Sequence, residues 1–311
     1  MPVKQLIEYY PDIVKLLLRD NTTGKNIIFA TNNYEGKSFT DEIIIDFLKA
    51  NPDAIKPRYT KNTEDQKKRT QNKAEVFTPI WIIEKMNNLI DNGWFGVDLP
   101  DDKSVFSSKD KIDFSSYGKT FMEYLKMTWL EITCGEAPYV TSRYDAATGK
   151  PILVPDRVGF LDRKLRVINE NTDDKAMWIA YADIALKACF GYEYQGDSLL
   201  IARANVLTTI SDHYAYKFHE QLSKEDFAIF AYYICNNFIQ MDGLTRCIPC
   251  ENPYDYKLWD GKTDKERQKN LVKIEQYVAE NGMIWSCFFD WSTGGLVRFR
   301  DLERNKSENL N

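Results

Sequence analysis

One stretch of sequence predicts the centre of the fold: Trp129-Leu130-Glu131-Ile132-Thr133-Cys134-Gly135-Glu136-Ala137-Pro138-Tyr139. It begins with the apolar character of a short buried strand, which is expected to end at Glu131. Small residues follow, among them Gly135 and Ala137, and a turn built from small residues lets the backbone approach a ligand closely. The stretch therefore predicts a strand followed by a ligand-binding turn.

Strand and helix patterns alternate along the rest of this region. Short apolar runs predict further strands at 189–193 and 238–241, with helices ending at about 187, spanning 197–210 and spanning 224–236. Helices between strands are typical crossover connections of parallel sheets. The pattern predicts an α/β fold with a parallel sheet.

Three regions are expected along the chain. Residues 1–73 form an α-rich N-terminal cap and a basic connector. Residues 74–260 form the α/β domain, with an insertion near 145–173. Residues 261–311 form a charged amphipathic helix followed by a β-hairpin.

Local signals divide the N-terminal cap into short elements. Pro11 interrupts a helical apolar pattern over 3–19, because proline cannot continue a helix from its interior. Residues 26–30 predict a short strand. Thr40 is expected to cap a helix that runs to about residue 50.

Composition limits the classes of protein and of chemistry. The 311 residues carry a formal net charge of -5 and are 43% hydrophobic, which is typical of a folded, soluble protein. No apolar run approaches the about 18–20 residues of a membrane span, and the start lacks a secretory signal, so we expect a cytoplasmic protein without membrane contacts. The two histidines, His213 and His219, are spaced unfavourably for zinc-protease or serine-hydrolase chemistry.

Three carboxylates fall at the ends of the predicted strands: Glu131, Glu193 and Asp242. Ligands of open α/β sheets bind outside the carboxyl ends of the strands, so we expect these acids to share one crevice. Carboxylates accept hydrogen bonds from ribose hydroxyls, exocyclic amines and ammonium groups. A nucleoside-containing cofactor offers such donors. Each acid taken alone is also explained by the start of a loop.

The sequence around Glu131 resembles the cofactor loop of S-adenosylmethionine-dependent adenine-N6 DNA methyltransferases of restriction-modification systems. Their pattern is apolar-Leu-Asp/Glu-Pro-Ala-Cys-Gly/Ala-x-Gly-x-Phe, and Glu131, Cys134, Gly135 and Tyr139 match it. Ala137 replaces the second Gly, and two other positions differ. The resemblance implies that this loop binds the methionine portion of S-adenosylmethionine.

An earlier segment, Glu75-Val76-Phe77-Thr78-Pro79-Ile80, is similar to the Glu-Phe-Phe-Thr-Pro element of the same family. That element precedes the cofactor loop in the γ-type order. The resemblance places Phe77, Thr78 and Pro79 at the cofactor, where the Thr and its backbone would hold the methionine carboxylate.

Two later segments also resemble the family, in the family's order. Residues 191–205 are similar to its Gly-x-Glu-x-Asp-Pro-x-Ala-Leu…Ala-Arg-x-Asn element, which implies that Glu193 binds the ribose hydroxyls. Gln195 stands where the family has a second acid. Residues 240–244 are similar to Gly-Asp-Ala/Gly-Leu, which implies that Asp242 accepts from the adenine amine.

The resemblance covers most of the chain and is nearest to proteins described as restriction endonuclease subunit M. It implies a Rossmann-like methyltransferase sheet, S-adenosylmethionine as cofactor and double-stranded DNA as substrate. Basic surfaces such as residues 56–73 would contact the phosphates, although an exposed linker explains that segment equally well. A specificity, restriction or second methyltransferase subunit would be a natural partner.

The family's Asp/Asn-Pro-Pro-Tyr/Phe catalytic loop has no full counterpart in this sequence. The nearest segment is Asn252-Pro253-Tyr254, which has one proline instead of two, and a simple turn is the favoured interpretation. These three residues are nevertheless the candidates for holding the target base. Two other hypotheses stay open: a non-catalytic cofactor- or DNA-binding subunit that needs a partner chain, and a small-molecule or RNA methyltransferase.

Six cysteines are present, and reduced thiols are the favoured interpretation. Cys247 and Cys250 have the spacing of a zinc knuckle, with Cys287 as a third ligand in that alternative. A fourth ligand is not evident, so no metal site is predicted.

Overall fold

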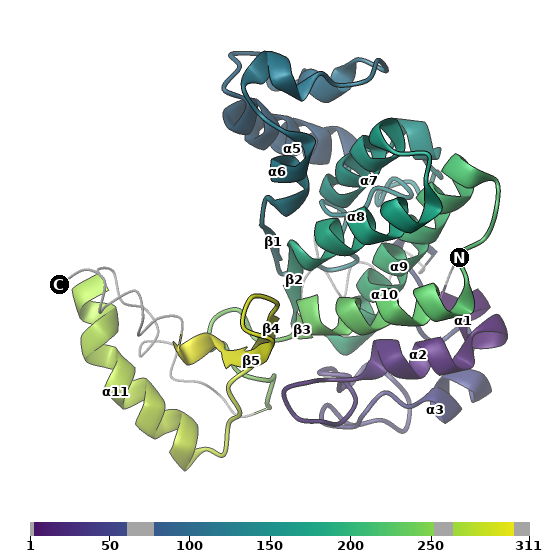
Figure 1. Cartoon of the computed structure of the whole chain (residues 1–311). Helices are drawn as coiled ribbons and strands as arrows, with labels where there is room; N and C mark the ends of the chain where they lie inside the picture. The colour runs from purple at the N-terminus through teal and green to yellow at the C-terminus, as the bar shows by residue number, and fades with distance from the viewer. Residues whose placement is uncertain (1–2, 61–77, 252–263, 302–311) are drawn as a thin grey trace.

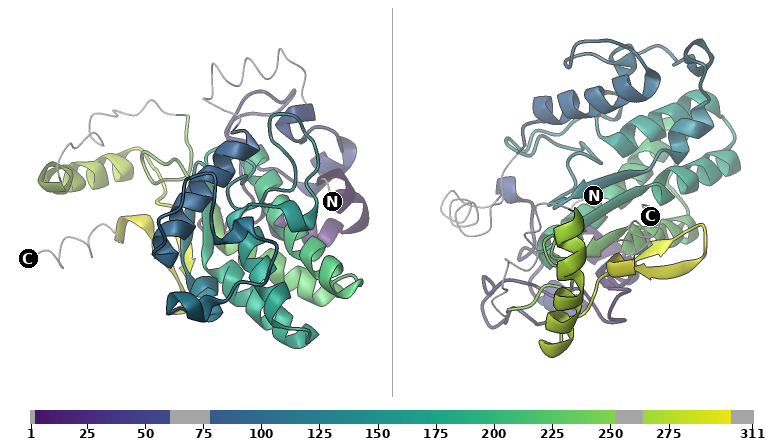
Figure 2. Two further views of the ribbon diagram at one scale, coloured as in Figure 1. Left: turned by 90° about the horizontal axis from the view of Figure 1, so that it is seen from above. Right: turned by 90° about the vertical axis from the view of Figure 1, so that its left-hand side faces the viewer.

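The computed structural model of the protein describes residues 3–60, 78–251 and 264–301 (Figures 1 and 2). The helices are α1 (Val3–Tyr9), α2 (Pro11–Leu18), α3 (Ile45–Ala50), α5 (Ile80–Phe95), α6 (Phe121–Lys126), α7 (Phe160–Asn171), α8 (Lys175–Lys187), α9 (Gly196–Phe218), α10 (Lys224–Asn237) and α11 (Asp264–Glu280). The strands are β1 (Trp129–Ile132), β2 (Cys189–Glu193), β3 (Phe238–Gln240), β4 (Cys287–Asp290) and β5 (Gly295–Arg298).

A small parallel sheet in the order β1-β2-β3 lies at the centre of the fold, which confirms the α/β class. Glu131 lies opposite Gly191, and Glu193 lies opposite Gln240. Helices α7 and α8 connect β1 to β2, and α9 and α10 connect β2 to β3. The predicted positions of all three strands are confirmed to within a residue or two.

The two faces of this sheet are covered differently. Cys189 and Phe238 belong to the main hydrophobic core, which the helices on one side of the sheet complete. On the other face, Tyr192 and Ile239 form a smaller cluster with Phe288 of the β4–β5 hairpin. The C-terminal helix and antiparallel hairpin expected over 261–311 are therefore present as α11 and β4–β5, and the hairpin covers part of the sheet.

A fully buried arginine, Arg203 in α9, connects the N-terminal cap to the sheet. Its guanidinium donates to the carbonyls of Leu17 at 2.6 Å and Arg19 at 2.8 Å, where α2 ends. It also donates to the carbonyls of Phe238 at 2.6 Å and Cys235 at 3.5 Å, where α10 runs into β3. These carbonyls have no helical partner, and a cation near a helix C-terminus is stabilising.

The N-terminal cap is helical, and Pro11 separates α1 from α2 as expected. The prediction of a strand at 26–30 is wrong. Instead, Asn26 forms an isolated bridge with Arg19, and Ile28 forms another with Glu42. Each bridge is a single residue pair, so this segment is a loop, and Ile27 packs in the main core.

The prediction that Thr40 caps a helix is also wrong, because α3 begins only at Ile45. The backbone N–H of Ile43 donates to the carbonyl of Ile27 at 2.9 Å, which keeps the preceding residues extended. A tertiary contact thus overrides the local capping signal.

The loop around Ile28 brings the cap against the sheet. Gln240 at the end of β3 accepts from the Ile28 N–H and donates to the Ile28 carbonyl, both at 2.8 Å. A Cβ atom at Gly196 would lie 2.1 Å from the same carbonyl oxygen. Only glycine therefore fits at the start of α9, because the cap backbone occupies that space.

The region 145–173, expected to be an insertion, contains α7, a helix of the main core. Lys164 of α7 is buried and donates to the carbonyls of Leu125 at 2.8 Å and Met127 at 2.6 Å. These hydrogen bonds hold α7 against the end of α6.

None of the helices in the described ranges combines the length and apolar character that crossing a bilayer requires.

We expect Arg203→Ala to lower the free energy of unfolding by about 3–5 kcal/mol, because it leaves buried carbonyls without donors. The matched control is Arg19→Ala, which removes an exposed arginine side chain from the end of α2 and should change stability by no more than about 0.5 kcal/mol. Urea unfolding followed by circular dichroism measures both. Equal effects of the two substitutions would contradict a stabilising role for the Arg203 hydrogen bonds.

Candidate functional site

The three predicted acids lie at or near the carboxyl ends of the three parallel strands, referred to below as the carboxyl edge of the sheet. Glu131 is in β1, Glu193 ends β2, and Asp242 follows β3, and all three are buried. Because the strands are parallel, their carboxyl ends meet at the same edge (Figure 1). The structure therefore places the three acids in neighbouring positions along this edge.

Glu131 points into the protein beneath the loop that follows β1. Its carboxylate accepts from the backbone N–H groups of Val140 at 3.2 Å and Tyr139 at 3.4 Å. Burial raises the pKa of Glu131 to about 8, the two N–H groups oppose this rise, and the charge of Glu193 adds to it. A carboxyl with this pKa is largely protonated at neutral pH.

The loop after β1 has an unusual backbone. Thr133, Gly135 and Ala137 have φ values of +49°, +53° and +60°, a left-handed conformation that costs a non-glycine residue about 1–2 kcal/mol. The Cys134 N–H donates to the carbonyl of Tyr192 at 2.9 Å, which fixes the loop to β2. Surrounding contacts thus hold the loop in a strained shape of the kind that is common at binding sites.

Glu193 joins the loop after β1 to the turn after β2. One carboxylate oxygen accepts from the Gly135 N–H at 2.8 Å, and the other accepts from the Gln195 N–H at 3.1 Å. Both oxygens of this buried side chain therefore have hydrogen-bond donors. Glu193 therefore shapes the predicted cofactor loop as well as lying beside it.

Asp242 organises the turn after β3. Its carboxylate accepts from the Leu244 N–H at 2.8 Å and the Thr245 N–H at 3.4 Å. Burial raises the pKa of Tyr192, the charge of Arg246 opposes this rise, and Asp242 adds to it. The Tyr192 carbonyl accepts from the Cys134 N–H, and a Cβ atom at Gly243 would lie 3.0 Å from the Tyr192 ring, so Tyr192 contacts both the β1 loop and the β3 turn.

Two features of this edge fit a ligand with hydrogen-bond donors. Gln195 Oε1 is buried and has no hydrogen-bond partner within the described ranges, and it follows Glu193 by two residues. A Cβ atom at Gly135 would meet nothing within 4 Å, so space is open beside the loop. An unsatisfied buried acceptor costs free energy, which a donor such as a hydroxyl group would recover.

The Thr78-Pro79 corner lies where α5 begins, with Pro79 as the residue before the helix. The N–H of Ile80 donates to the Asp145 carboxylate at 3.3 Å, and Asn87 of α5 donates to the carbonyl of Tyr139 at 3.1 Å. The corner is thus held against the chain that continues from the β1 loop. Phe77 lies outside the described residues.

The sequence did not single out a polar cluster beneath the loop. Glu136 accepts from the Tyr144 hydroxyl through a short hydrogen bond and from the Arg58 N–H at 2.7 Å. Asn205 of α9 donates to the Glu136 carbonyl and to the Tyr144 hydroxyl oxygen, both at 3.0 Å. The Ala-Arg-x-Asn element that ends at Asn205 was the available signal, and its Arg and Asn turn out to connect separate parts of the chain.

The candidates for the target base, Asn252, Pro253 and Tyr254, lie outside the described residues. All six cysteines are free thiols. Within the described ranges, no group of three or more His, Cys, Asp or Glu side chains could hold a metal ion. Cys247 and Cys287 therefore do not belong to such a group.

Comparisons with protein-family models, curated proteins and solved structures found no match to this chain. The roles of the site residues therefore depend on the motifs and on the geometry described above.

We expect the stability of the protein to fall as the pH rises, partly because of Glu131. Below its ordinary pKa of 4.5, Glu131 is protonated in both states, and between 4.5 and about 8 only the unfolded chain loses the proton. The free energy of unfolding should therefore decrease across this window, by up to about 1.4 kcal/mol per pH unit from this residue.

Glu131→Gln, which keeps a hydrogen-bond acceptor but cannot titrate, should remove that part of the slope. Urea unfolding at several pH values between 5 and 8 compares the two proteins. Parallel curves would show that Glu131 has the same pKa in the folded and unfolded protein.

Proposed function

We propose that this chain is an S-adenosylmethionine-dependent adenine-N6 DNA methyltransferase, or the modification subunit of a restriction-modification system, built on a Rossmann-like sheet. The observation that carries the proposal is the contact between Glu193 and the Gly135 N–H, at 2.8 Å. It brings together two segments that resemble the family's cofactor elements and lie far apart in the sequence. Asp242 follows the adjacent strand.

The residues present suit the cofactor chemically. Glu193 and the unsatisfied Gln195 oxygen supply acceptors for the ribose hydroxyls, and Asp242 supplies an acceptor for the adenine amine. The Thr78 corner and the loop around Gly135 would bind the methionine portion. The cofactor, when bound, supplies a methyl group on a sulfonium ion.

Methyl transfer from a sulfonium needs little acid-base chemistry, so the protein's main tasks are positioning and the exclusion of water. The strained loop at 133–137 and its contacts to β2 hold backbone groups in a fixed geometry. Rigid placement of this kind is the contribution expected from these residues. The target base would be held by residues such as Asn252 and Tyr254.

A second candidate is a subunit that binds the cofactor or DNA but needs a partner chain for catalysis. Two observations favour it. A complete Asn-Pro-Pro-Tyr loop is absent from the sequence. In addition, β1 is an edge strand of the described sheet, and its apolar side chains Leu130 and Ile132 are 49% and 61% exposed. Strands of parallel sheets are normally covered on both faces, so a partner could cover this exposed face of β1.

We expect Glu193→Gln to weaken S-adenosylmethionine binding by about 1.5–3 kcal/mol, the range for a hydrogen bond to a charged group. Glutamine keeps one oxygen that can accept from the Gly135 N–H, so this variant tests the charge with less damage to the loop than alanine. Glu225→Gln, an exposed change on α10, is the matched control. Calorimetry measures the affinities, and an unchanged affinity in Glu193→Gln would remove this carboxylate from the site.

Transfer of a labelled methyl group to unmethylated duplex DNA separates the two candidates. Incorporation by the isolated chain supports the enzyme and rejects the subunit that depends on a partner. Incorporation only after a candidate partner subunit is added supports the second proposal. Cofactor binding without transfer in any combination would reject the methyltransferase.

If a partner covers β1, Leu130→Lys should abolish transfer that depends on the partner, because a charge would be buried in the interface. Cofactor affinity should stay within twofold of that of the unmodified chain. Leu99→Lys, at a loop residue that is 40% exposed, is the matched control. Full activity of Leu130→Lys with the partner would exclude this face of β1 as the interface.

A further inference from the structure

A cavity of about 830 Å³ lies beside α5. It is bounded by the first half of α5, residues 102–109, residues 145–158 and the start of α7. This volume is within the usual range of small-molecule sites. The cavity is not lined by Glu131, Glu193 or Asp242, so the predicted cofactor acids do not account for it.

The lining of the cavity includes apolar side chains: Ile80, Phe106, Ile152, Leu153 and Pro155. Leu153 is 72% exposed. The flat face of a nucleobase would cover such side chains and remove them from water, which is favourable.

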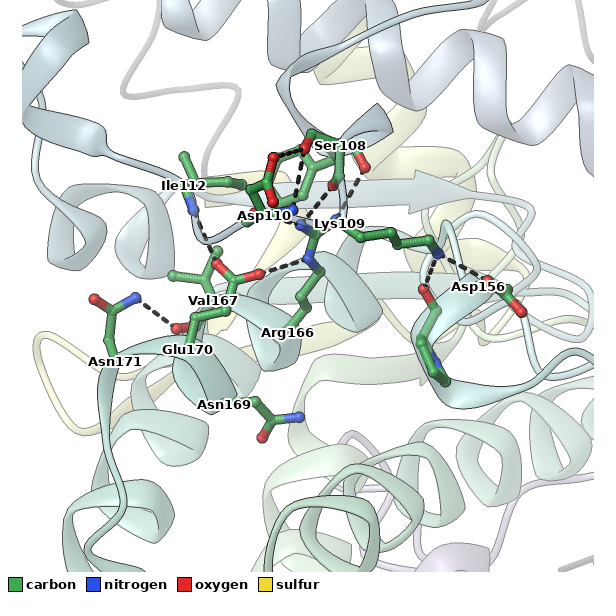
Figure 3. A network of polar contacts seen from close by, with 12 residues as sticks. Ser108, Lys109, Asp110, Ile112, Asp156, Arg166, Val167, Asn169, Glu170 and Asn171 are labelled. Atoms are coloured by element: carbon green, nitrogen blue, oxygen red, sulfur yellow. Dashed lines mark hydrogen bonds and ion pairs between the residues drawn. The ribbon is translucent and has the colours of Figure 1, made fainter.

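Most of the charged side chains around the cavity already have partners. Lys109 pairs with Asp156 at 2.8 Å, and Arg166 pairs with Glu170 at 2.7 Å while donating to the carbonyls of Phe106 and Ser108 (Figure 3). These contacts connect residues 106–110 to α7 and to the turn at 154–156. The contacts of Lys109 and Arg166 thus hold the segments around the cavity together.

Four charged side chains of the lining have no side-chain hydrogen bond or ion pair within the described part of the chain. Two are amines, Lys103 and Lys150, and two are carboxylates, Glu84 and Asp102. Three of them are exposed and Glu84 is half-buried. The cavity therefore offers two cations and two hydrogen-bond acceptors next to an apolar surface.

We infer that this cavity binds a nucleotide whose base carries an exocyclic amine, either free or within a nucleic-acid strand. The base would pack on the apolar residues around Leu153, the amine would donate to Glu84 or Asp102, and the phosphate would pair with Lys103 and Lys150. An adenine nucleotide has all three features. A simple anion would leave the apolar surface uncovered.

The cavity also adjoins the Thr78-Pro79 corner, because Ile80 and Asp145 line it and are hydrogen-bonded to each other at 3.3 Å. A nucleotide held there would lie next to the proposed cofactor site. Its role as the methyl acceptor rests on the proposed function, whereas nucleotide binding itself does not. The binding experiment is therefore performed without S-adenosylmethionine, so that the two proposals fail separately.

Calorimetry with adenosine 5′-monophosphate and inosine 5′-monophosphate tests the chemistry. Inosine monophosphate has a carbonyl in place of the amine, so it should bind at least about fivefold more weakly. The source of the nucleotide is tested with single-stranded and duplex oligonucleotides that contain adenine. Tighter binding of an oligonucleotide than of the monophosphate identifies a strand as the ligand, and the reverse order identifies the free nucleotide.

The variant Lys103→Ala/Lys150→Ala should weaken binding of the preferred nucleotide ligand at least about fivefold. Lys25→Ala/Lys126→Ala removes the same charge at exposed positions outside the lining and should change the affinity less than twofold. Glu84→Gln/Asp102→Asn should reduce the preference for adenosine over inosine monophosphate.

Three results would overturn the inference. The first is that the folded protein binds neither the monophosphates nor the oligonucleotides. The second is that the two lysine pairs have equal effects, because the attraction would then come from general charge. The third is equal affinity for adenosine and inosine monophosphate in the unmodified chain. Circular dichroism of each variant confirms that the fold is retained.

Discussion

The buried carboxylate of Glu193 is the constraint on which the candidate site depends. It lies at the end of β2, and its two oxygens accept from backbone N–H groups of two different turns, at Gly135 and at Gln195. A buried polar group is costly unless it is hydrogen-bonded, so these contacts keep the β1 loop near β2. The loop in turn places the Tyr139 and Val140 N–H groups against Glu131. One interaction therefore determines how two segments distant in sequence form one edge.

The proposed function would give Glu193 a second role beside its structural one. If its carboxylate accepted from a ribose hydroxyl as proposed, the same oxygens would also accept from the Gly135 and Gln195 N–H groups, which would couple ligand binding to the shape of the loop. Burial raises the pKa of Glu131 to about 8, and the charge of the nearby Glu193 carboxyl adds to this rise.

The remainder of the fold supports this edge from several directions. Arg203 connects the ends of α2 and α10, and Gln240 pairs with the backbone of Ile28, so the N-terminal cap is attached next to β3. The β1 side is different, because Leu130 and Ile132 are exposed there within the described sheet. The exposed apolar face of β1 is the observation that supports the second proposal, a subunit that needs a partner chain.

The sequence by itself determined the elements whose signals are local. The alternation of apolar strands and amphipathic helices predicted β2, β3, α8, α10, α11 and the hairpin, and Pro11 divided the first two helices, because periodicity and proline act within a few residues. The position of the three acids at or just after the strands followed from the same patterns, whereas the order β1-β2-β3 in the sheet did not. Only the tertiary structure decided where backbone groups find distant partners. Thr40 does not cap a helix because Ile43 pairs with Ile27, and Arg203 and Asn205 bind carbonyls that no spacing rule connects to them. The cavity beside α5 is formed by four separate segments, and such a hollow exists only after the chain has folded.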